Sequence, residues 1–190
     1  CAMPPEDRPQ VLALTSAGIG EGVTTVSHGL ARALAESGAR RVLVVDTDLR
    51  SPPLEREVSS HGLAQVLAEG ANYEAALKGE GGVRRLLSGG PVATDPGELL
   101  GGRATGELLE RLREDYDFVL LDTPPVNDYP DPSILGRRAD ATILVVEAGR
   151  TSRMAAQEAI ERLRAAGASV AGVILNRHHD PLPEWAQQVL

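Results

Sequence analysis

The stretch AGIGEGVTT, residues 17–25, decides the fold because it joins a short apolar run to a helical pattern. Its glycines allow backbone N–H groups to turn inward around a phosphate, and the helix that follows adds its positive N-terminal end. The general phosphate-loop pattern G-x-x-x-x-G-K-[ST] is not met, since Ala17 stands at its first glycine and Val23 at its lysine. Taken alone, the stretch slightly favours a plain glycine-rich turn.

Outward from this loop, apolar runs alternate with segments of helical periodicity. The runs predict strands over 11–15, 42–45, 83–87, 118–121, 141–146 and 170–175. The periodic segments predict helices over 24–37, 63–68, 73–77, 105–114 and 153–166. Alternation of this kind indicates an α/β fold, a three-layer sandwich around a mostly parallel sheet. In such sheets ligands bind at the carboxyl ends of the strands.

Composition excludes several classes of function. The chain has 190 residues, a formal net charge of -8 and one cysteine, Cys1. Because nucleic-acid binding needs a basic surface, we expect no nucleic-acid partner. A single cysteine provides neither a disulfide framework nor a cysteine-based metal site. No apolar run approaches the roughly 20 residues that span a bilayer, and we expect a cytoplasmic protein.

Carboxylates follow two of the predicted strands. Asp46 and Asp48 come after the second apolar run, and Asp122 comes after the run at 118–121. Two carboxylates one residue apart suit a hydrated magnesium ion or a base that accepts a proton. Each of these residues is also compatible with an ordinary turn or capping aspartate. The glycine-rich loop, the Asp46–Asp48 pair and Asp122 all follow predicted strands. Because these three features coincide at strand ends, the sequence favours a nucleotide site.

These motifs resemble those of the cytoplasmic kinase domain of bacterial tyrosine kinases. The family's loop, S-x-x-P-G-E-G-K-[ST]-T, is matched by residues 16–25 except at Ile19 and Val23. Its second motif, D-x-D-x-R, is met by residues 46–50, and its third, D-x-P-P, by residues 122–125. The resemblance covers roughly residues 10–178. It implies a P-loop NTPase-like fold, with ATP and Mg²⁺ as cofactors.

The resemblance also implies roles for individual residues. The loop backbone would surround the phosphates, with Thr25 closing the motif, and Asn176 and Arg177 would lie beside the adenine, although an ordinary loop pair is an equal alternative for those two. Asp46 would be the catalytic base, with Asp48 supporting the metal and, if the protein is active, catalysis. Thr24 and Asp122 would hold magnesium. The expected nucleotide-binding residues are Gly20, Glu21, Gly22, Val23, Thr24, Thr25, Asn176 and Arg177; the expected metal ligands are Thr24, Asp48 and Asp122.

Two departures from the family pattern bear on activity. Val23 replaces the lysine that neutralises the β and γ phosphates, and no tyrosine follows Tyr129. We therefore expect a degenerate, regulatory kinase-like domain that binds ATP weakly or not at all. One alternative is an active kinase or ATPase that uses a substitute cation such as Arg50. Another is a spatial-organisation ATPase of the MinD or ParA kind.

The resemblance finally implies partners and boundaries. The expected partner is a membrane-bound polysaccharide co-polymerase of capsule or exopolysaccharide export, at the inner face of the cell membrane, and a homo-oligomer is compatible with it. We expect one kinase-like domain over residues 10–178. Residues 1–9 are expected to be disordered or a cloning remnant, and residues 179–190 a C-terminal tail.

Overall fold

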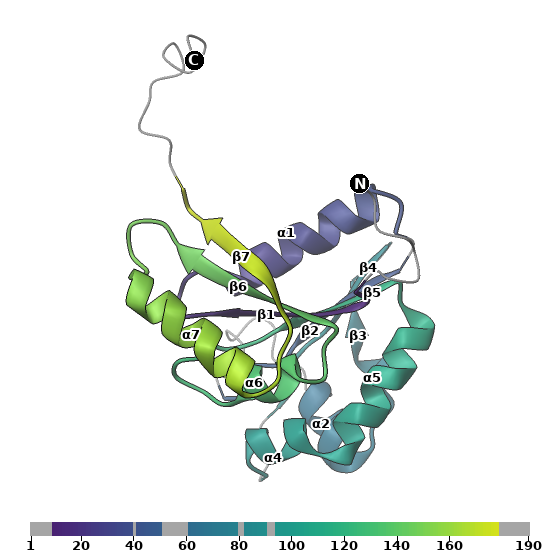
Figure 1. The fold of residues 1–190 in the computed structure, drawn as a ribbon. Coiled ribbons are helices and arrows are strands. Elements are labelled where there is room, and N and C mark those ends of the chain that lie inside the picture. Colours follow the sequence, from purple (N-terminus) through teal and green to yellow (C-terminus); the bar gives the residue numbers. More distant parts are fainter. Residues whose placement is uncertain (1–8, 40, 51–60, 80–81, 91–93, 179–190) are drawn as a thin grey trace.

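The computed structural model describes residues 9–39, 41–50, 61–79, 82–90 and 94–178 (Figure 1). The expected C-terminal tail, and all but the last residue of the expected N-terminal segment, lie outside these ranges. Within the described ranges, no helix is both long enough and apolar enough to cross a bilayer.

Seven strands form one sheet at the centre of the molecule, in the order β3-β4-β2-β5-β1-β6-β7. Every neighbouring pair is parallel except β3 with β4, which is antiparallel. The predicted, mostly parallel sheet is therefore confirmed. The strands are β1 (Val11–Ser16), β2 (Val42–Asp46), β3 (Leu77–Lys78), β4 (Val83–Leu86), β5 (Phe118–Asp122), β6 (Ala141–Glu147) and β7 (Val170–Asn176).

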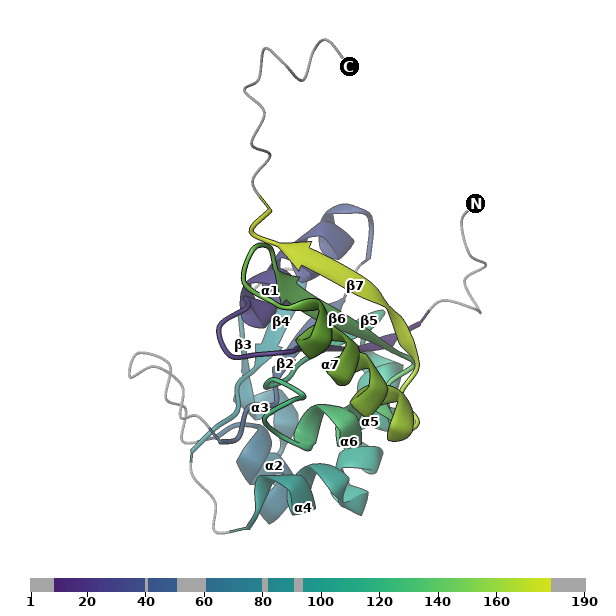
Figure 2. The same cartoon turned by 60° about the vertical axis from the view of Figure 1, so that its left-hand side comes forward.

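Helices cover both faces of the sheet and complete the predicted three layers. Helix α1 lies on one face, and α5, α6 and α7 lie on the opposite face (Figures 1 and 2). The turned view in Figure 2 also places α2 and α4 on the side of α5 and α6. The helices are α1 (Val23–Glu36), α2 (Leu63–Glu69), α3 (Tyr73–Ala76), α4 (Pro96–Gly101), α5 (Arg103–Asp115), α6 (Asp131–Gly136) and α7 (Arg153–Ala165).

Strand β1 shows why the sequence has unbroken apolar runs. Leu12 and Leu14 belong to the core cluster under α1, whereas Val11 and Ala13 belong to the cluster that α5 covers. Successive side chains of a strand point to opposite faces, so a strand covered on both faces needs apolar residues at every position. The same packing brings the carboxyl ends of β1, β2 and β5 to one edge.

The structure adds three elements that the sequence reading did not include. They are the two short helices α4 and α6 and the two-residue strand β3, which takes the end of the predicted helix at 73–77. Asp95 caps α4, because its side chain accepts hydrogen bonds from the backbone N–H groups of Gly97 and Glu98. Proline follows an aspartate at the start of both helices, a typical start signal.

Candidate functional site

The loop between β1 and α1 has the backbone shape that its glycines predict. Gly20 and Gly22 adopt φ angles of 81° and 93°, in the left-handed region. A Cβ atom on Gly22 would lie 2.2 Å from the side-chain nitrogen of Asn176. Position 22 therefore requires glycine for two reasons, the backbone angle and the close approach of β7.

Glu21 and Asn176 hold this loop in place. The carboxylate of Glu21 accepts a hydrogen bond from the N–H of Ala17 at 3.0 Å and another from the hydroxyl of Thr151. The side-chain amide of Asn176 donates to the carbonyl oxygen of Glu21 at 2.8 Å. Glu21 is only 4% exposed. Its side chain thus fastens the loop to the segment after β6, a role that the sequence reading missed.

The predicted carboxylates meet beside the loop. Asp46 and Asp122 are register partners at the ends of β2 and β5, so the two motifs are brought together by the parallel pairing. The backbone N–H of Asp48 donates to the carboxylate of Asp46 at 3.1 Å, which orders the turn after β2. This geometry agrees with the expectation that the three motifs converge at one edge of the sheet.

Burial makes these carboxylates reluctant to ionise. Desolvation raises the pKa of Asp122 to about 7, against a hydrogen bond from Thr24 that lowers it, and the charges of Asp46 and Asp48 raise it further. Desolvation likewise raises the pKa of Asp46, although the backbone N–H of Asp48 lowers it. A pair of carboxylates held this way gains most when a cation is bound between them.

A pocket of about 570 Å³ opens over this edge of the sheet. It brings together most of the residues expected to bind nucleotide or metal. Those that line it are Gly20, Glu21, Gly22, Val23, Thr24, Asp46, Asp48, Asp122 and Arg177. Thr25 is exposed and, like Asn176, is not among the described residues that line this pocket. Residues that line it without having been predicted include His28, Arg85 and Tyr129.

Val23 has an apolar environment on one side and the pocket on the other. It is 9% exposed and packs in the core cluster that contains Leu12, Leu14 and Ala31. It is also the first residue of α1, directly after the left-handed Gly22. The position expected to carry a phosphate-binding lysine thus contributes to the core and offers the pocket no charge.

Arg50, considered as a substitute cation, is held away from this role. Its guanidinium donates two hydrogen bonds to the carboxylate of Asp131, at 2.6 and 2.9 Å. Asp131 is fully buried, and the ring centroid of Tyr129 lies 5.3 Å from the guanidinium carbon. Arg50 is not among the described residues that line the pocket. Its charge therefore balances Asp131 and connects the second motif to α6.

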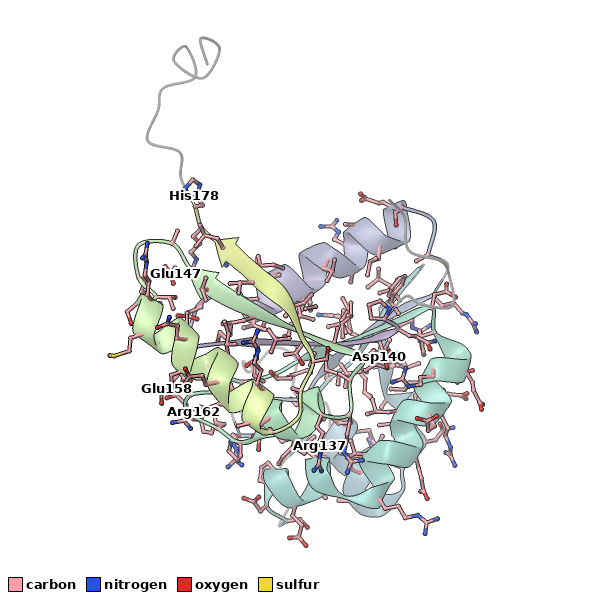
Figure 3. All side chains as sticks on the ribbon, viewed as in Figure 1. Arg137, Asp140, Glu147, Glu158, Arg162 and His178 are labelled. Carbon is pink, nitrogen blue, oxygen red and sulfur yellow. The ribbon has the colours of Figure 1, made fainter. Side chains whose placement is uncertain are left out.

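Arg177 reaches the pocket from the end of β7. Its guanidinium forms an ion pair with Glu147 at 3.0 Å, and Glu147 also pairs with Arg150 at 3.0 Å. Figure 3 shows Glu147 at the end of β6, at the same end of the sheet as His178, which follows Arg177. The hydrogen bond from Arg177 is the main cause that lowers the pKa of Glu147.

The pocket fits a magnesium–nucleotide complex in its main features. Two left-handed glycines and the start of a 14-residue helix form a backbone cradle for phosphate. The hydroxyl of Thr24 is hydrogen-bonded to the carboxylate of Asp122, and both are oxygen groups of the kind that Mg²⁺ binds together with phosphate and water. The feature that does not fit is Val23.

Comparison with known proteins gives these features a family. Residues 12–185 match the CobQ/CobB/MinD/ParA nucleotide binding domain. The chain is 34% identical to the tyrosine-protein kinase YwqD of Bacillus subtilis, over 86% of this chain and 70% of that protein. It is 31% identical to the tyrosine-protein kinase CpsD of Streptococcus agalactiae, over 93% of this chain and 78% of that protein.

Solved structures give the same grouping. The kinase domain of Escherichia coli tyrosine kinase ETK has a TM-score of 0.80 at 29% identity, over 92% of this chain and 71% of that one. The septum site-determining protein MinD of Pyrococcus horikoshii, complexed with Mg-ADP, has a TM-score of 0.71 at 28% identity. The match covers 95% of this chain and 77% of that one. The chain therefore belongs to the CobQ/CobB/MinD/ParA nucleotide-binding family and, within it, groups with the bacterial tyrosine kinases.

Proposed function

We propose that this chain is a degenerate tyrosine-kinase-like domain that binds magnesium–ATP weakly. It transfers the terminal phosphoryl group of ATP very slowly or not at all. The observation that supports this proposal is the packing of Val23 in the apolar core at the position of the loop lysine. A hydrogen bond to a charged group contributes about 1.5–3 kcal/mol, and charge stabilisation is worth more in the transition state. The backbone cradle remains, so phosphate binding is weakened and phosphoryl transfer is weakened further.

In this proposal the remaining side chains keep positioning roles. Thr24 and Asp122 would hold Mg²⁺, which when bound offsets the charge of the phosphates, and Asp48 would support that site. Asp46, whose pKa is raised mainly by burial, would accept the proton of an attacking hydroxyl if any transfer occurs. The ion pair between Arg50 and Asp131 argues against Arg50 as a replacement for the lysine.

The family membership also supports a cellular role. By resemblance to bacterial tyrosine kinases, we propose that the domain acts as a regulatory component beside a membrane-bound polysaccharide co-polymerase, at the inner face of the membrane. The alternative of a spatial-organisation ATPase draws support from the likeness to MinD. The closer structural match to the ETK kinase domain, with a TM-score of 0.80 against 0.71 for MinD, favours the first.

Calorimetric titration with magnesium–ATP tests the biochemical part of the proposal. We expect weak binding, and we expect mass spectrometry to find no phosphate on Tyr73, Tyr116 or Tyr129 after incubation with magnesium–ATP. The Asp46→Asn variant lacks the expected proton acceptor. Its rate provides the background for the turnover assay. Low-micromolar affinity together with measurable turnover above that background would contradict the degenerate assignment.

A further inference from the structure

Strand β4 carries two adjacent arginines that serve different sites. Arg84 lines a groove with Arg41, Tyr73 and Tyr116, on the side of the sheet that α5 covers. Arg85 lines the pocket that contains the phosphate loop and the three carboxylates. This division follows from the period of two along a strand, which sends neighbouring side chains to opposite faces. The two arginines therefore form a natural pair for comparison.

The register of the sheet places Arg85 beside the carboxylates. Arg85 pairs with Val44 on the adjacent strand β2, and Val44 belongs to the core cluster that contains Val23. Neighbouring strands lie about 4.8 Å apart, and register partners project to the same face. Asp46 follows Val44 by two residues and so points to that face as well. Arg85 thus shares with Val23 and Asp46 the α1 face of the sheet.

The charges that line the pocket single out Arg85. Three aspartates line it, and among its described lining residues the side chains able to carry positive charge are His28, Arg85 and Arg177. Arg177 follows β7, the edge strand on the far side of the sheet from β4. Arg85 is partly buried, it lies one strand from Asp46, and a guanidinium stays protonated in every ordinary environment.

Resting on the proposed function, we propose that Arg85 supplies the positive charge that Val23 lacks and binds the terminal phosphate of the magnesium–nucleotide complex from the β4 side of the pocket. The planar guanidinium can give two parallel hydrogen bonds to one phosphoryl group. A phosphate bound in this way lies between the loop backbone and β4. The cation then lies on β4, beside the strand β2 that carries Asp46, instead of in the loop after β1, and the pocket keeps a counter-charge for its ligand.

Two matched variants test the assignment. Arg85→Gln and Arg84→Gln remove the same charge from the same strand but from opposite faces. In calorimetric titrations, Arg85→Gln should weaken magnesium–ATP binding at least tenfold, which corresponds to about 1.4 kcal/mol. It should weaken magnesium–ADP binding much less, because the γ-phosphate is missing there. Arg84→Gln should leave both affinities close to those of the unmodified protein.

A second pair of variants separates loss of charge from loss of structure. Arg85→Lys should keep most of the affinity for magnesium–ATP, and Val23→Lys should restore binding to the Arg85→Gln protein. Thermal unfolding, monitored by circular dichroism, checks that each variant is folded. If Arg85→Gln does not fold, Arg85→Met replaces it.

The outcomes distinguish this inference from the function on which it rests. Equal effects of the two glutamine variants, or an unchanged magnesium–ATP affinity in a folded Arg85→Gln protein, would overturn the role of Arg85. Binding by Val23→Lys but not by the unmodified protein would also overturn it, since Arg85 would then supply no useful charge. If neither of these two proteins binds magnesium–ATP, the nucleotide-binding function itself is wrong.

Discussion

Asp46 and Asp122 are register partners on the neighbouring parallel strands β2 and β5, and both end their strands at the edge of the same pocket. Asp122 is buried, and desolvation with the nearby charges raises its pKa to about 7 although Thr24 lowers it. The pair therefore carries less negative charge near neutral pH than two exposed aspartates would. A bound cation would remove the proton and order both side chains.

Magnesium binding should consequently depend on pH around neutrality. Asp122 must be ionised to bind the metal, so Mg²⁺ affinity should rise by about tenfold from pH 6 to pH 8 for one proton that titrates near pH 7. Calorimetric titration with MgCl₂ in the presence of ADP measures this dependence. The exposed Asp128→Asn variant serves as the control and should show the same rise, whereas Asp122→Asn should bind Mg²⁺ weakly at both pH values. A flat profile in the unmodified protein would contradict the role of Asp122.

The same carboxylate predicts how stability changes with pH. The folded state holds the proton of Asp122 up to about pH 7, whereas the unfolded chain releases it near the ordinary value of 3.8. Between these values the folded state binds more protons, so the free energy of unfolding falls as pH rises and stays low above pH 7. One pKa unit corresponds to 1.36 kcal/mol, so this contribution approaches about 4 kcal/mol. Asp122→Asn removes it.

Urea unfolding without Mg²⁺ at pH 4, 6 and 8 checks this prediction. The difference in unfolding free energy between Asp122→Asn and the unmodified protein should move in favour of the variant as pH rises from 4 to about 7. Comparing the two proteins at each pH cancels the titration of the groups that do not interact with Asp122. A difference that is constant with pH would show that Asp122 titrates normally in the folded state.

Much of the fold could be predicted because its strands are covered on both faces. Apolar runs such as 118–121 are short, unbroken and followed by aspartates, so both the strand and its functional end are visible in the sequence. The helices α4 and α6 were missed because each has only six residues, too few to show a helical period. Their Asp-Pro starts, at Asp95 and Asp131, were the available signal.

The parts of the site that could not be predicted depend on contacts between distant residues. Arg50 and Asp131 are 81 positions apart, and nothing in either local sequence indicates their pairing. Glu21 was expected to bind nucleotide, yet its carboxylate accepts hydrogen bonds from the backbone N–H of Ala17 and the hydroxyl of Thr151. The arginines of β4 lowered the strand signal, and only the observed register shows that Arg85 faces the pocket.

Removing Arg50 should destabilise the protein without abolishing its ligand site. The Arg50→Met change leaves the fully buried carboxylate of Asp131 without its ion-pair partner, and breaking a buried pair costs about 3–5 kcal/mol. The exposed pair of Arg103 and Glu107 gives the control, since Arg103→Met should cost less than about 1 kcal/mol. Urea unfolding measures both values. Equal effects would mean that the pair with Asp131 contributes little.

Gly22 should tolerate no side chain. Alanine there would place its Cβ 2.2 Å from the amide nitrogen of Asn176 and would hold a non-glycine residue at a φ angle of 93°. Backbone strain of this kind costs about 1–3 kcal/mol. Asn176→Ala removes the clash but also the hydrogen bond to the carbonyl oxygen of Glu21, so in thermal unfolding Gly22→Ala should cost less stability in an Asn176→Ala background than in the unmodified protein. Gly29→Ala, on the open surface of α1, is the control and should not destabilise the helix.

Val23 provides the most direct test of what the loop has lost. Its side chain packs in the core yet lines the pocket, so a lysine can keep its stem among the apolar residues while its ammonium reaches the phosphates. We expect Val23→Lys to strengthen magnesium–ATP binding at least tenfold, or about 1.4 kcal/mol. Val23→Met is the matched control, because it has a straight stem without charge and should leave the affinity near its original value. Calorimetric titration of the three proteins at two salt concentrations identifies the cause of any gain in affinity. A gain that comes from the lysine charge becomes smaller as the salt concentration rises. Tighter binding by both variants would indicate improved packing of the loop, and no gain with lysine would mean that the cradle itself no longer has the geometry for a triphosphate.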